Sequence, residues 1–308
     1  MQIKIKNANS NLCKKCLYTS LPVDLMIRFA KQANPEYDFY YRSGMSERIV
    51  ISNQDAAHRI VTDMIQDGFY IGFVETLVKI QTEGFMGHRY ELRGLENVVN
   101  SLIDEGFNYD EISGRFYENQ EERISPNWGR LQNGEEQKMA VLKLDIAGNS
   151  ALVKNNPGEK IRKAYEDIRN IVNMAVTTRA GRLWTWEGDG ALAAFLFGPI
   201  DKLVVYAGME ILHELFFYNR LRNPLDSPIN IRMGAHIGQV RYSDNEIERQ
   251  KDDTVKQVMS LESIAAVNSL CVSFNMYITM DTNTLNLFSK EKTSRAGKYR
   301  LYTYGVEK

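Results

Sequence analysis

Two aspartates in the second half of the chain have the setting that metal-dependent chemistry requires. Asp145 comes near the end of a short apolar run, 139-MAVLKLDIA-147, and Asp189 is the central residue of a Gly-Asp-Gly turn within 185-TWEGDGALAAF-195. Two carboxylates that lie close together in an apolar setting repel each other and therefore need a cation. Oxygen-only ligands favour Mg²⁺ or Mn²⁺, often with a nucleotide phosphate completing the coordination shell. The pair therefore predicts a site for two divalent cations.

A turn made of small residues follows the first aspartate. Ile146 and Ala147 lead into Gly148, Asn149 and Ser150, and a helical pattern begins there. Small side chains leave backbone N–H groups open to a polyphosphate, which binds well where a helix begins. Gly148, Asn149 and Ser150 are therefore candidate substrate-binding residues.

The elements that must hold these residues follow one another in an informative order. Apolar runs predict strands at 139–147, 229–243 and 270–278, and helical periodicity covers 158–181, 201–221 and 254–269. The segment 184–195 predicts a hairpin with Asp189 at its tip. The order β-α-β-β-α-β-α-β is that of a ferredoxin-like βαββαβ core with an extension, an α+β fold. In such a sheet the first strand and the hairpin are neighbours, so both carboxylates reach one edge.

The first part of the chain has a different pattern. Amphipathic helices are predicted at 54–69, 70–85 and 95–107, and no acid, base or nucleophile converges among them. The polar segment 118–137 contains Pro126 and Gly129 and has no periodicity. We therefore expect a small, mainly helical regulatory domain over 1–117, a linker over 118–137, and a second domain over 138–308 that carries the aspartates.

The composition of the chain excludes several classes of protein. Of the 308 residues 44% are apolar and 25% are charged, which favours folded domains with a real core. The formal net charge of −1 gives no bulk electrostatic case for nucleic acid or an anionic membrane as a partner. The sequence has no run of about 18 apolar residues, so we predict no membrane span. The N-terminus lacks an apolar signal core, so we expect a cytoplasmic protein.

The few cysteines agree with a reducing compartment. Cys13 and Cys16 form a C-x-x-C pair, and Cys271 lies far away in the sequence. A zinc site would need two further ligands, and no second cysteine pair follows. The favoured interpretation is that the two are small packing side chains, with a metal site or a redox pair as alternatives. The histidines that could complete a metal site are His58, His88, His213 and His236.

Five segments of the second domain, in order, resemble the motifs of the class III nucleotidyl cyclases. Residues 145-DIAGNSAL-152 resemble D-I-x-G-F-T-x-L, and 181-GRLWTWEGDGALAAF-195 resembles G-G-x-x-x-K-x-x-G-D-x-x-M-A-x-F. Residues 232-RMGAHIGQV-240 are similar to R-I-G-I-H-x-G-x-V. Residues 253-DTVKQVMSLESIA-265 resemble D-T-V-N-x-A-x-R-L-E-x-x-A, and 271-CVSFNMY-277 resembles I-x-V-S-x-x-x-Y. The resemblance covers about 138–304.

The resemblance implies a fold, a reaction and a set of roles. Cyclases of this class form head-to-tail homodimers with active sites at the interface. Asp145, Asp189 and the backbone carbonyl of Ile146 would bind two Mg²⁺ or Mn²⁺ ions. The ribose 3′-hydroxyl of a nucleoside triphosphate would attack the α-phosphate, release pyrophosphate and leave a 3′,5′-cyclic nucleotide. Such catalysis needs positioning and charge neutralisation more than acid–base side chains.

The positions that read the base depart from the family pattern. Adenylyl cyclases have a Lys, and guanylyl cyclases a Glu, where this chain has Thr185. A second base-reading Asp corresponds to Arg249 in a gapless alignment, with Asp252 close by. Strand alternation predicts that Trp184 and Trp186 both point into the core, away from Thr185. The base pocket is therefore not that of a known purine cyclase.

The residues that stabilise the transition state also differ. The family Asn corresponds to Lys256 and the following Arg to Ser260. Lys256 is a candidate catalytic residue because its ammonium can bring positive charge to the phosphates. Arg232 and Arg241 flank the strand of the third motif and are candidates for the same task, with a surface position as the alternative. His236, in the middle of that strand, is interpreted as a core residue.

The chain keeps both metal-binding aspartates but lacks the residues that read a purine base. In this combination it resembles the bacterial pyrimidine cyclases of Pycsar anti-phage systems. These make cyclic UMP or cyclic CMP, which activates a separate effector. The expected substrate is therefore UTP or CTP, with UTP favoured because Thr and Arg suit a base with two carbonyls and one N–H. Three alternatives stay open at this point: a purine cyclase with a redesigned pocket, a catalytically inactive nucleotide-binding module, and a polymerase with a related palm.

Overall fold

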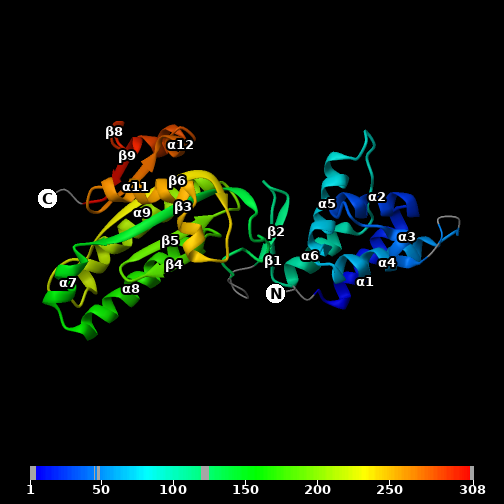
Figure 1. Cartoon of the computed structure of the whole chain (residues 1–308), viewed down its shortest axis with the longest axis horizontal. Helices are drawn as coiled ribbons and strands as arrows, with labels where there is room; N and C mark the ends of the chain where they lie inside the picture. The colour runs from blue at the N-terminus through cyan, green and yellow to red at the C-terminus, as the bar shows by residue number, and fades with distance from the viewer. Residues whose placement is uncertain (1–4, 45, 47–48, 119–124, 306–308) are drawn as a thin grey trace. The chain divides into compact units, whose positions relative to one another are not determined.

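The computed structural model describes residues 5–44, 46, 49–118 and 125–305. The chain divides into two compact units, Met1–Arg123 and Ile124–Lys308 (Figure 1). The division falls within the predicted linker, 118–137. Residues 119–124 of that segment lie outside the described residues, and a strand already begins at Glu136. The linker is therefore shorter than the polar composition of 118–137 predicted.

The described part of the first unit is built from helices and one β-hairpin. The helices predicted at 54–69, 70–85 and 95–107 are confirmed as α4, α5 and α6. Their apolar faces pack around one core that includes Ile60, Phe73, Leu77 and Leu102. The described elements are α1 (Asn7–Ser20), α2 (Val23–Ala33), α3 (Phe39–Ser43), α4 (Asn53–Gln66), α5 (Tyr70–Glu83), α6 (Leu95–Asp104), β1 (Phe107–Asp110) and β2 (Arg115–Glu118).

Helix α1 was not predicted because its buried face is partly polar. Asn9 and Ser10 are buried beside Cys13 and Cys16. Asn9 Nδ2 donates to the Val98 carbonyl at 2.9 Å, which satisfies the buried amide. Both cysteines are free thiols, and burial raises the pKa of each to about 12. Both side chains lie in the core of this unit, which agrees with the packing interpretation of the C-x-x-C pair.

The second unit has the predicted ferredoxin-like core. Its seven-stranded mixed sheet has the order β4-β5-β3-β6-β7-β9-β8, and the first four strands give the βαββαβ arrangement. Among the described strands of this sheet, only β6 and β7 pair in parallel. The elements are β3 (Glu136–Ala147), α7 (Asn149–Asn155), α8 (Gly158–Thr177), β4 (Arg182–Glu187), β5 (Gly190–Phe195), α9 (Ile200–Leu221), β6 (Asn230–Arg241), α10 (Glu246–Gln250), α11 (Asp253–Ile264), β7 (Ser269–Ser273), α12 (Phe274–Tyr277), α13 (Thr282–Leu285), β8 (Lys292–Ser294) and β9 (Gly297–Thr303).

The strand predicted at 270–278 was too long. The Ser273 hydroxyl accepts from the Met276 N–H and so caps the short helix α12, which ends β7. The apolar residues after Ser273 therefore continue as a helix, which a short apolar run cannot reveal by periodicity alone. None of the helices within the described ranges is both long and apolar enough to cross a membrane.

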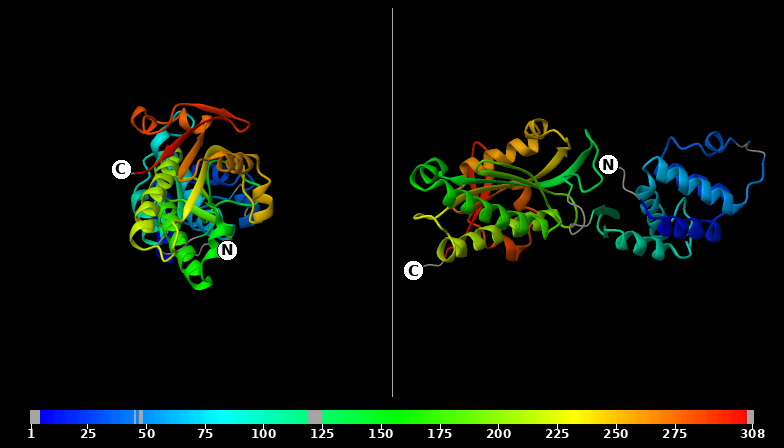
Figure 2. Two further views of the ribbon diagram at one scale, coloured as in Figure 1. Left: turned by 90° about the vertical axis from the view of Figure 1, so that its left-hand side faces the viewer. Right: turned by 90° about the horizontal axis from the view of Figure 1, so that it is seen from below.

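The two faces of the sheet have different coverings. Helices α8 and α9 lie side by side along one face, where they bury alternate residues of β3, including Leu142, Leu144 and Ile146 (Figure 2). Side chains alternate along a strand, so Lys143 and Asp145 point to the opposite face. Helix α11 packs on that opposite face, which we call the α11 face. Because side chains alternate along β3, Asp145 therefore lies outside the main core.

Two glycines of β6 allow α11 to pack closely. A Cβ on Gly234 would lie 2.6 Å from the backbone N of Glu262 and 2.6 Å from the carbonyl O of Val258. A Cβ on Gly238 would meet the Thr254 hydroxyl. Real Cβ contacts are not this short, so α11 rests on strand backbone at both points. The two glycines of the R-M-G-A-H-I-G motif therefore position α11.

A segment just before β3 is attached to strand β4. Trp128 is fully buried, and its Nε1 donates to the Ala180 carbonyl at 2.7 Å. Trp184 Nε1 donates to the Pro126 carbonyl at 2.9 Å, and Arg182 Nε donates to the Ser125 carbonyl at 2.9 Å. These contacts explain why 118–137 was wrongly predicted to be a linker throughout. Its residues are mostly polar, but the part from Ser125 to Trp128 is held in place by the buried side chains of Trp128, Trp184 and Arg182.

Candidate active site

The two aspartates lie at one edge of the sheet, as predicted. Asp145 on β3 is the cross-strand neighbour of Gly190, the first residue of β5. Asp189 precedes Gly190 in the turn between β4 and β5, and its carbonyl accepts from the Ile146 N–H at 3.0 Å. The hairpin tip is therefore fastened to β3 directly beside Asp145. This places both aspartates where the sequence analysis expected them.

The carbonyl of Ile146 points toward the same place. In a strand the N–H and C=O of one residue point to the same side. The Ile146 N–H points at Asp189, so the Ile146 carbonyl also faces the hairpin tip, while its side chain is buried in the core. Two carboxylates and one carbonyl are an all-oxygen donor set, which fits Mg²⁺ or Mn²⁺.

An arginine completes the immediate surroundings of Asp145. Arg232 on β6 is the cross-strand neighbour of Asp145, and its Nη2 lies 2.9 Å from Asp145 Oδ2. Its Nε lies 3.3 Å from Glu262 Oε1 on α11. The sequence left the position of Arg232 open between the site and the surface. The structure places it at the site, whereas Arg241 is exposed at the far end of β6.

Three further residues at this edge were not predicted. Burial, followed by the charge of Asp145, raises the pKa of the Glu262 carboxyl, while Arg232 and Lys143 lower it. Burial together with both aspartates raises the pKa of the Tyr165 phenol. Lys143 could have been found, because it lies two residues before Asp145 and so on the same face of β3. Tyr165 and Glu262 come from helices, and only the fold brings them here.

The turn after Asp145 has the conformation that small residues permit. Gly148 has a φ of +74° and immediately precedes helix α7. Tyr165 donates its hydroxyl hydrogen to Asn149 Oδ1, which ties α8 to the turn. Asn149 and Ser150 are the first two residues of α7. The turn therefore lies close to Asp145 and Asp189, whose charges also act on Tyr165.

A β-bulge at Trp184 changes which side chains share a face with Thr185. Leu183 pairs with Ala193 and Thr185 pairs with Leu192, so Trp184 is an extra residue in the ladder. Trp186 packs against the core under α8 and α9, as predicted. Trp184 instead contacts Trp128 and Tyr242, on the same face as Thr185. The prediction that both tryptophans point away from Thr185 was therefore wrong for Trp184.

Arg249 does not occupy the base-reading position that the alignment gave it. It is only 5% exposed, and its Nη1 donates to the Ser243 carbonyl at 3.0 Å. Its Nη2 donates to the Trp184 carbonyl at 3.4 Å, and its guanidinium lies over the Trp184 ring. Arg249 therefore fastens α10 to the bulge. Asp252, the alternative reader, caps α11 by accepting from the Thr254 N–H at 2.9 Å.

We expect Arg249→Met to lower stability by about 1–3 kcal/mol, because the carbonyls of Ser243 and Trp184 lose a charged donor in a buried or partly buried setting. Urea unfolding measures the change. Arg162→Met is the matched control, because Arg162 is exposed on α8 and its replacement should be nearly neutral. Equal midpoints for the two variants would show that Arg249 does not have this structural role.

Lys256 lies apart from the aspartates. It is on the exposed side of α11, and its Nζ pairs with Asp253 Oδ1 at 2.9 Å. The Ser260 hydroxyl, at the position of the family Arg, donates to the Lys256 carbonyl at 3.0 Å. Within one chain the structure therefore brings Asp145, Asp189, Ile146 and Arg232 together and leaves Lys256 outside this group.

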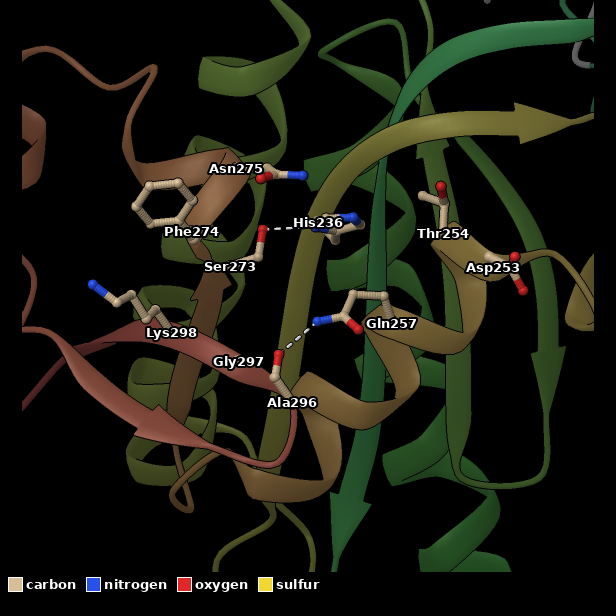
Figure 3. Close-up of a pocket in the computed structure, with 10 residues that line it drawn as sticks. All are labelled: His236, Asp253, Thr254, Gln257, Ser273, Phe274, Asn275, Ala296, Gly297 and Lys298. Atoms are coloured by element: carbon tan, nitrogen blue, oxygen red, sulfur yellow. Dashed lines mark hydrogen bonds between the residues drawn. The ribbon is translucent and has the colours of Figure 1, made fainter.

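A hollow of about 410 Å³ lies on the α11 face, next to the exposed side of that helix. Figure 3 shows His236 in hydrogen-bond contact with Ser273, and Gln257 donating to the Ala296 carbonyl. Burial lowers the pKa of His236 and so favours its neutral imidazole. His236 therefore lines a hollow on this face and does not point into the core under α8 and α9. Asp253 is part of the lining, whereas Asp145 and Asp189 are not.

No group of three or more His, Cys, Asp or Glu side chains within the described ranges is arranged to hold a metal ion. Asp145 and Asp189 are two carboxylates, and their third donor would be the Ile146 backbone carbonyl. The donor set thus fits divalent ions whose remaining ligands come from water and substrate phosphates, as Mg²⁺ prefers.

Comparison with known proteins gave only structural matches. No protein-family model and no curated protein matches the chain. It is similar to the adenylate/guanylate cyclase/hydrolase from Silicibacter pomeroyi, with 19% identity and a TM-score of 0.46, over 56% of this chain and 99% of that one. It is also similar to the guanylyl cyclase domain of the RhoGC fusion protein from Blastocladiella emersonii, with 13% identity and a TM-score of 0.45, over 55% and 98%. The guanylate cyclase domain of RhGC from Catenaria anguillulae matches with 15% identity and a TM-score of 0.44, over 55% and 96%. At these identities the likeness concerns the fold alone.

Proposed function

We propose that the chain is a nucleotidyl cyclase that converts a pyrimidine nucleoside triphosphate, UTP or CTP, to its 3′,5′-cyclic nucleotide and pyrophosphate. The observation that carries the proposal is the group at the sheet edge. Asp145, Asp189 and the Ile146 carbonyl face one place, and Arg232 lies beside them. An acidic donor set next to a guanidinium suits a metal-bound polyphosphate.

Each residue at the edge has a task in such a reaction. Asp145, Asp189 and the Ile146 carbonyl would hold two divalent ions, Mg²⁺ or Mn²⁺. When bound, these ions neutralise phosphate charge and help activate the ribose 3′-hydroxyl. Arg232 supplies a bidentate donor to phosphate oxygens as its contact with Asp145 is released. The backbone of Gly148, Asn149 and Ser150 orients the triphosphate so that the hydroxyl lies in line with the α-phosphate.

A second copy of the chain would complete the site. Lys256 is exposed and outside the aspartate group, so it would serve a site whose aspartates come from the other subunit. A head-to-tail homodimer with active sites at its interface satisfies this requirement. Lys256 would then bring positive charge to the phosphates in the position of the family Asn.

The proposed base is a pyrimidine because the position that selects a purine is occupied by Thr185. Its hydroxyl can both donate and accept a hydrogen bond, which suits either the N–H or a carbonyl of uracil. Arg249 is buried and supplies no support for UTP over CTP, so the preference for UTP now depends on Thr185. The cyclic product would act as a second messenger for a separate effector in anti-phage defence, with the first unit regulating its synthesis.

The test is to incubate the purified chain with ATP, GTP, CTP and UTP in turn, with Mn²⁺, and to identify the products by mass spectrometry. We expect one cyclic pyrimidine nucleotide, which is lost in Asp145→Ala. Cyclic AMP or cyclic GMP as the main product would refute the pyrimidine assignment and retain the cyclase. If no cyclic product formed from any of the four nucleotides although the chain bound nucleotide, the chain would instead be an inactive binding module.

A further inference from the structure

Arg232 lies between two carboxylates that come from different elements. Its Nη2 is 2.9 Å from Asp145 Oδ2 on β3, and its Nε is 3.3 Å from Glu262 Oε1 on α11. The Glu262 side chain is 12% exposed, against 26% for Asp145. Both anions therefore share one guanidinium, and the Glu262 side of this arrangement is the more enclosed.

The position of Glu262 is fixed by backbone packing. Its own N atom is one of the atoms that a Cβ on Gly234 would contact at 2.6 Å. Gly234 follows Arg232 by two residues and so lies on the same face of β6. The helix turn that carries Glu262 therefore rests on the strand that carries Arg232. Their contact does not depend on Asp145.

The charges around Arg232 nearly balance. Asp145, Asp189 and Glu262 are acidic, and Arg232 and Lys143 are basic; both aspartates also act electrostatically on Tyr165 of α8. A divalent ion that binds Asp145 must compete with Arg232 for that carboxylate. If Asp145 were its only acidic partner, Arg232 would compete more strongly with the ion for this carboxylate. Once displaced, it would also have no ion pair to hold it in place. Glu262 offers it a second partner that stays in place.

We propose that Glu262 is a positioning residue: it retains Arg232 at the sheet edge while a divalent ion takes Asp145, so that the guanidinium stays ready for the triphosphate. This inference rests on the proposed function, because it assumes metal binding at Asp145. It predicts opposite effects for the two partners on metal affinity. Loss of the Glu262 charge weakens metal binding, and loss of the Arg232 charge strengthens it.

The first test measures Mn²⁺ binding to the full chain without nucleotide, by electron paramagnetic resonance of free Mn²⁺. We expect Glu262→Gln to raise the Kd for Mn²⁺ about 3- to 10-fold, and Arg232→Gln to lower it by a similar factor, as one unit charge a few ångströms away implies. Glu210→Gln is the matched control. Glu210, on α9, pairs with Arg179 just after the end of α8, on the other side of the sheet, and its loss should leave the Kd unchanged.

The second test separates positioning from general stability. We expect Glu262→Gln to raise KM for the nucleotide by a larger factor than it lowers kcat, because Arg232 is less well placed to bind phosphate. Glu262→Asp keeps the charge and moves it by one methylene, so its Mn²⁺ affinity should fall between those of wild type and Glu262→Gln. Urea midpoints for every variant show whether the chain is folded.

The outcomes distinguish this inference from the proposed function. A wild-type chain that does not bind Mn²⁺, or that binds it equally after Asp145→Asn, contradicts the proposed function itself. Binding that needs Asp145 but is the same in wild type and Glu262→Gln overturns only the role of Glu262. Tighter binding by a folded Glu262→Gln would reverse the predicted sign and also overturn it.

Discussion

Asp145→Asn should reduce cyclic-nucleotide formation by a factor of about 10³ or more. The amide keeps the shape of the side chain and removes the charge that holds a divalent ion, and electrostatic stabilisation is the main catalytic term for phosphoryl transfer. The side chain is only partly buried, and Arg232 keeps Glu262 as a partner, so the fold should remain intact. Product formed per minute at saturating Mn²⁺ measures the loss.

The matched control is Asp226→Asn. Asp226 is an exposed carboxylate whose only ion pair in the described part of the chain is a 3.8 Å contact with Lys160, and it lies outside the aspartate group. Its replacement should leave turnover near that of wild type. Retention of more than a tenth of the wild-type rate by a folded Asp145→Asn variant would remove Asp145 from the metal site and leave the two-ion proposal without its main ligand.

Gly234→Ala should have the largest effect on the architecture of the site. The added Cβ would lie 2.6 Å from two backbone atoms of α11, and neither can move without shifting the helix. Overpacking of this kind costs about 2–3 kcal/mol. The shift would also withdraw Glu262 from Arg232, so KM for the nucleotide should rise along with the loss of stability. Urea unfolding and steady-state kinetics on the same preparation measure the two effects.

Gly158→Ala provides the comparison. Gly158 is the first residue of α8, and an added Cβ there meets no atom within 4 Å. The same methyl group should be neutral or slightly stabilising, because alanine favours a helix more than glycine does. If Gly234→Ala unfolded at the same urea concentration as Gly158→Ala, the close packing of α11 on β6 would not be a requirement of the fold.

The core of the second unit could be predicted because its signals are local. The Gly-Asp-Gly turn flanked by apolar residues defines the hairpin, and long periodic segments define α8 and α9. The first unit was harder. The buried face of α1 includes Asn9 and Ser10, which form part of the interior only because partners such as the Val98 carbonyl are supplied from far away in the sequence. Amphipathic periodicity cannot detect such a helix.

The candidate site divides in the same way. Asp145 and Asp189 follow from the spacing of motifs on neighbouring strands. Arg249 was misplaced because an alignment position says nothing about burial, and its two carbonyl acceptors come together only through the bulge at Trp184. Glu262 was overlooked because it lies next to Arg232 only where α11 packs closely on β6, and this close packing is possible because Gly234 has no side chain. A missing atom leaves no pattern that residue types alone can reveal.

The attachment of the Ser125–Trp128 segment to β4 has a practical consequence for dissecting the chain. A shortened protein that began at β3 would lack the carbonyls that receive Trp184 Nε1 and Arg182 Nε, and would leave the Ala180 carbonyl without the Trp128 indole. Its β4–β5 hairpin would then expose the indole of Trp184 and the guanidinium of Arg182, which are buried in the intact chain. The second unit, if prepared by itself, should therefore start before Ser125, although the first strand of its sheet begins only at Glu136.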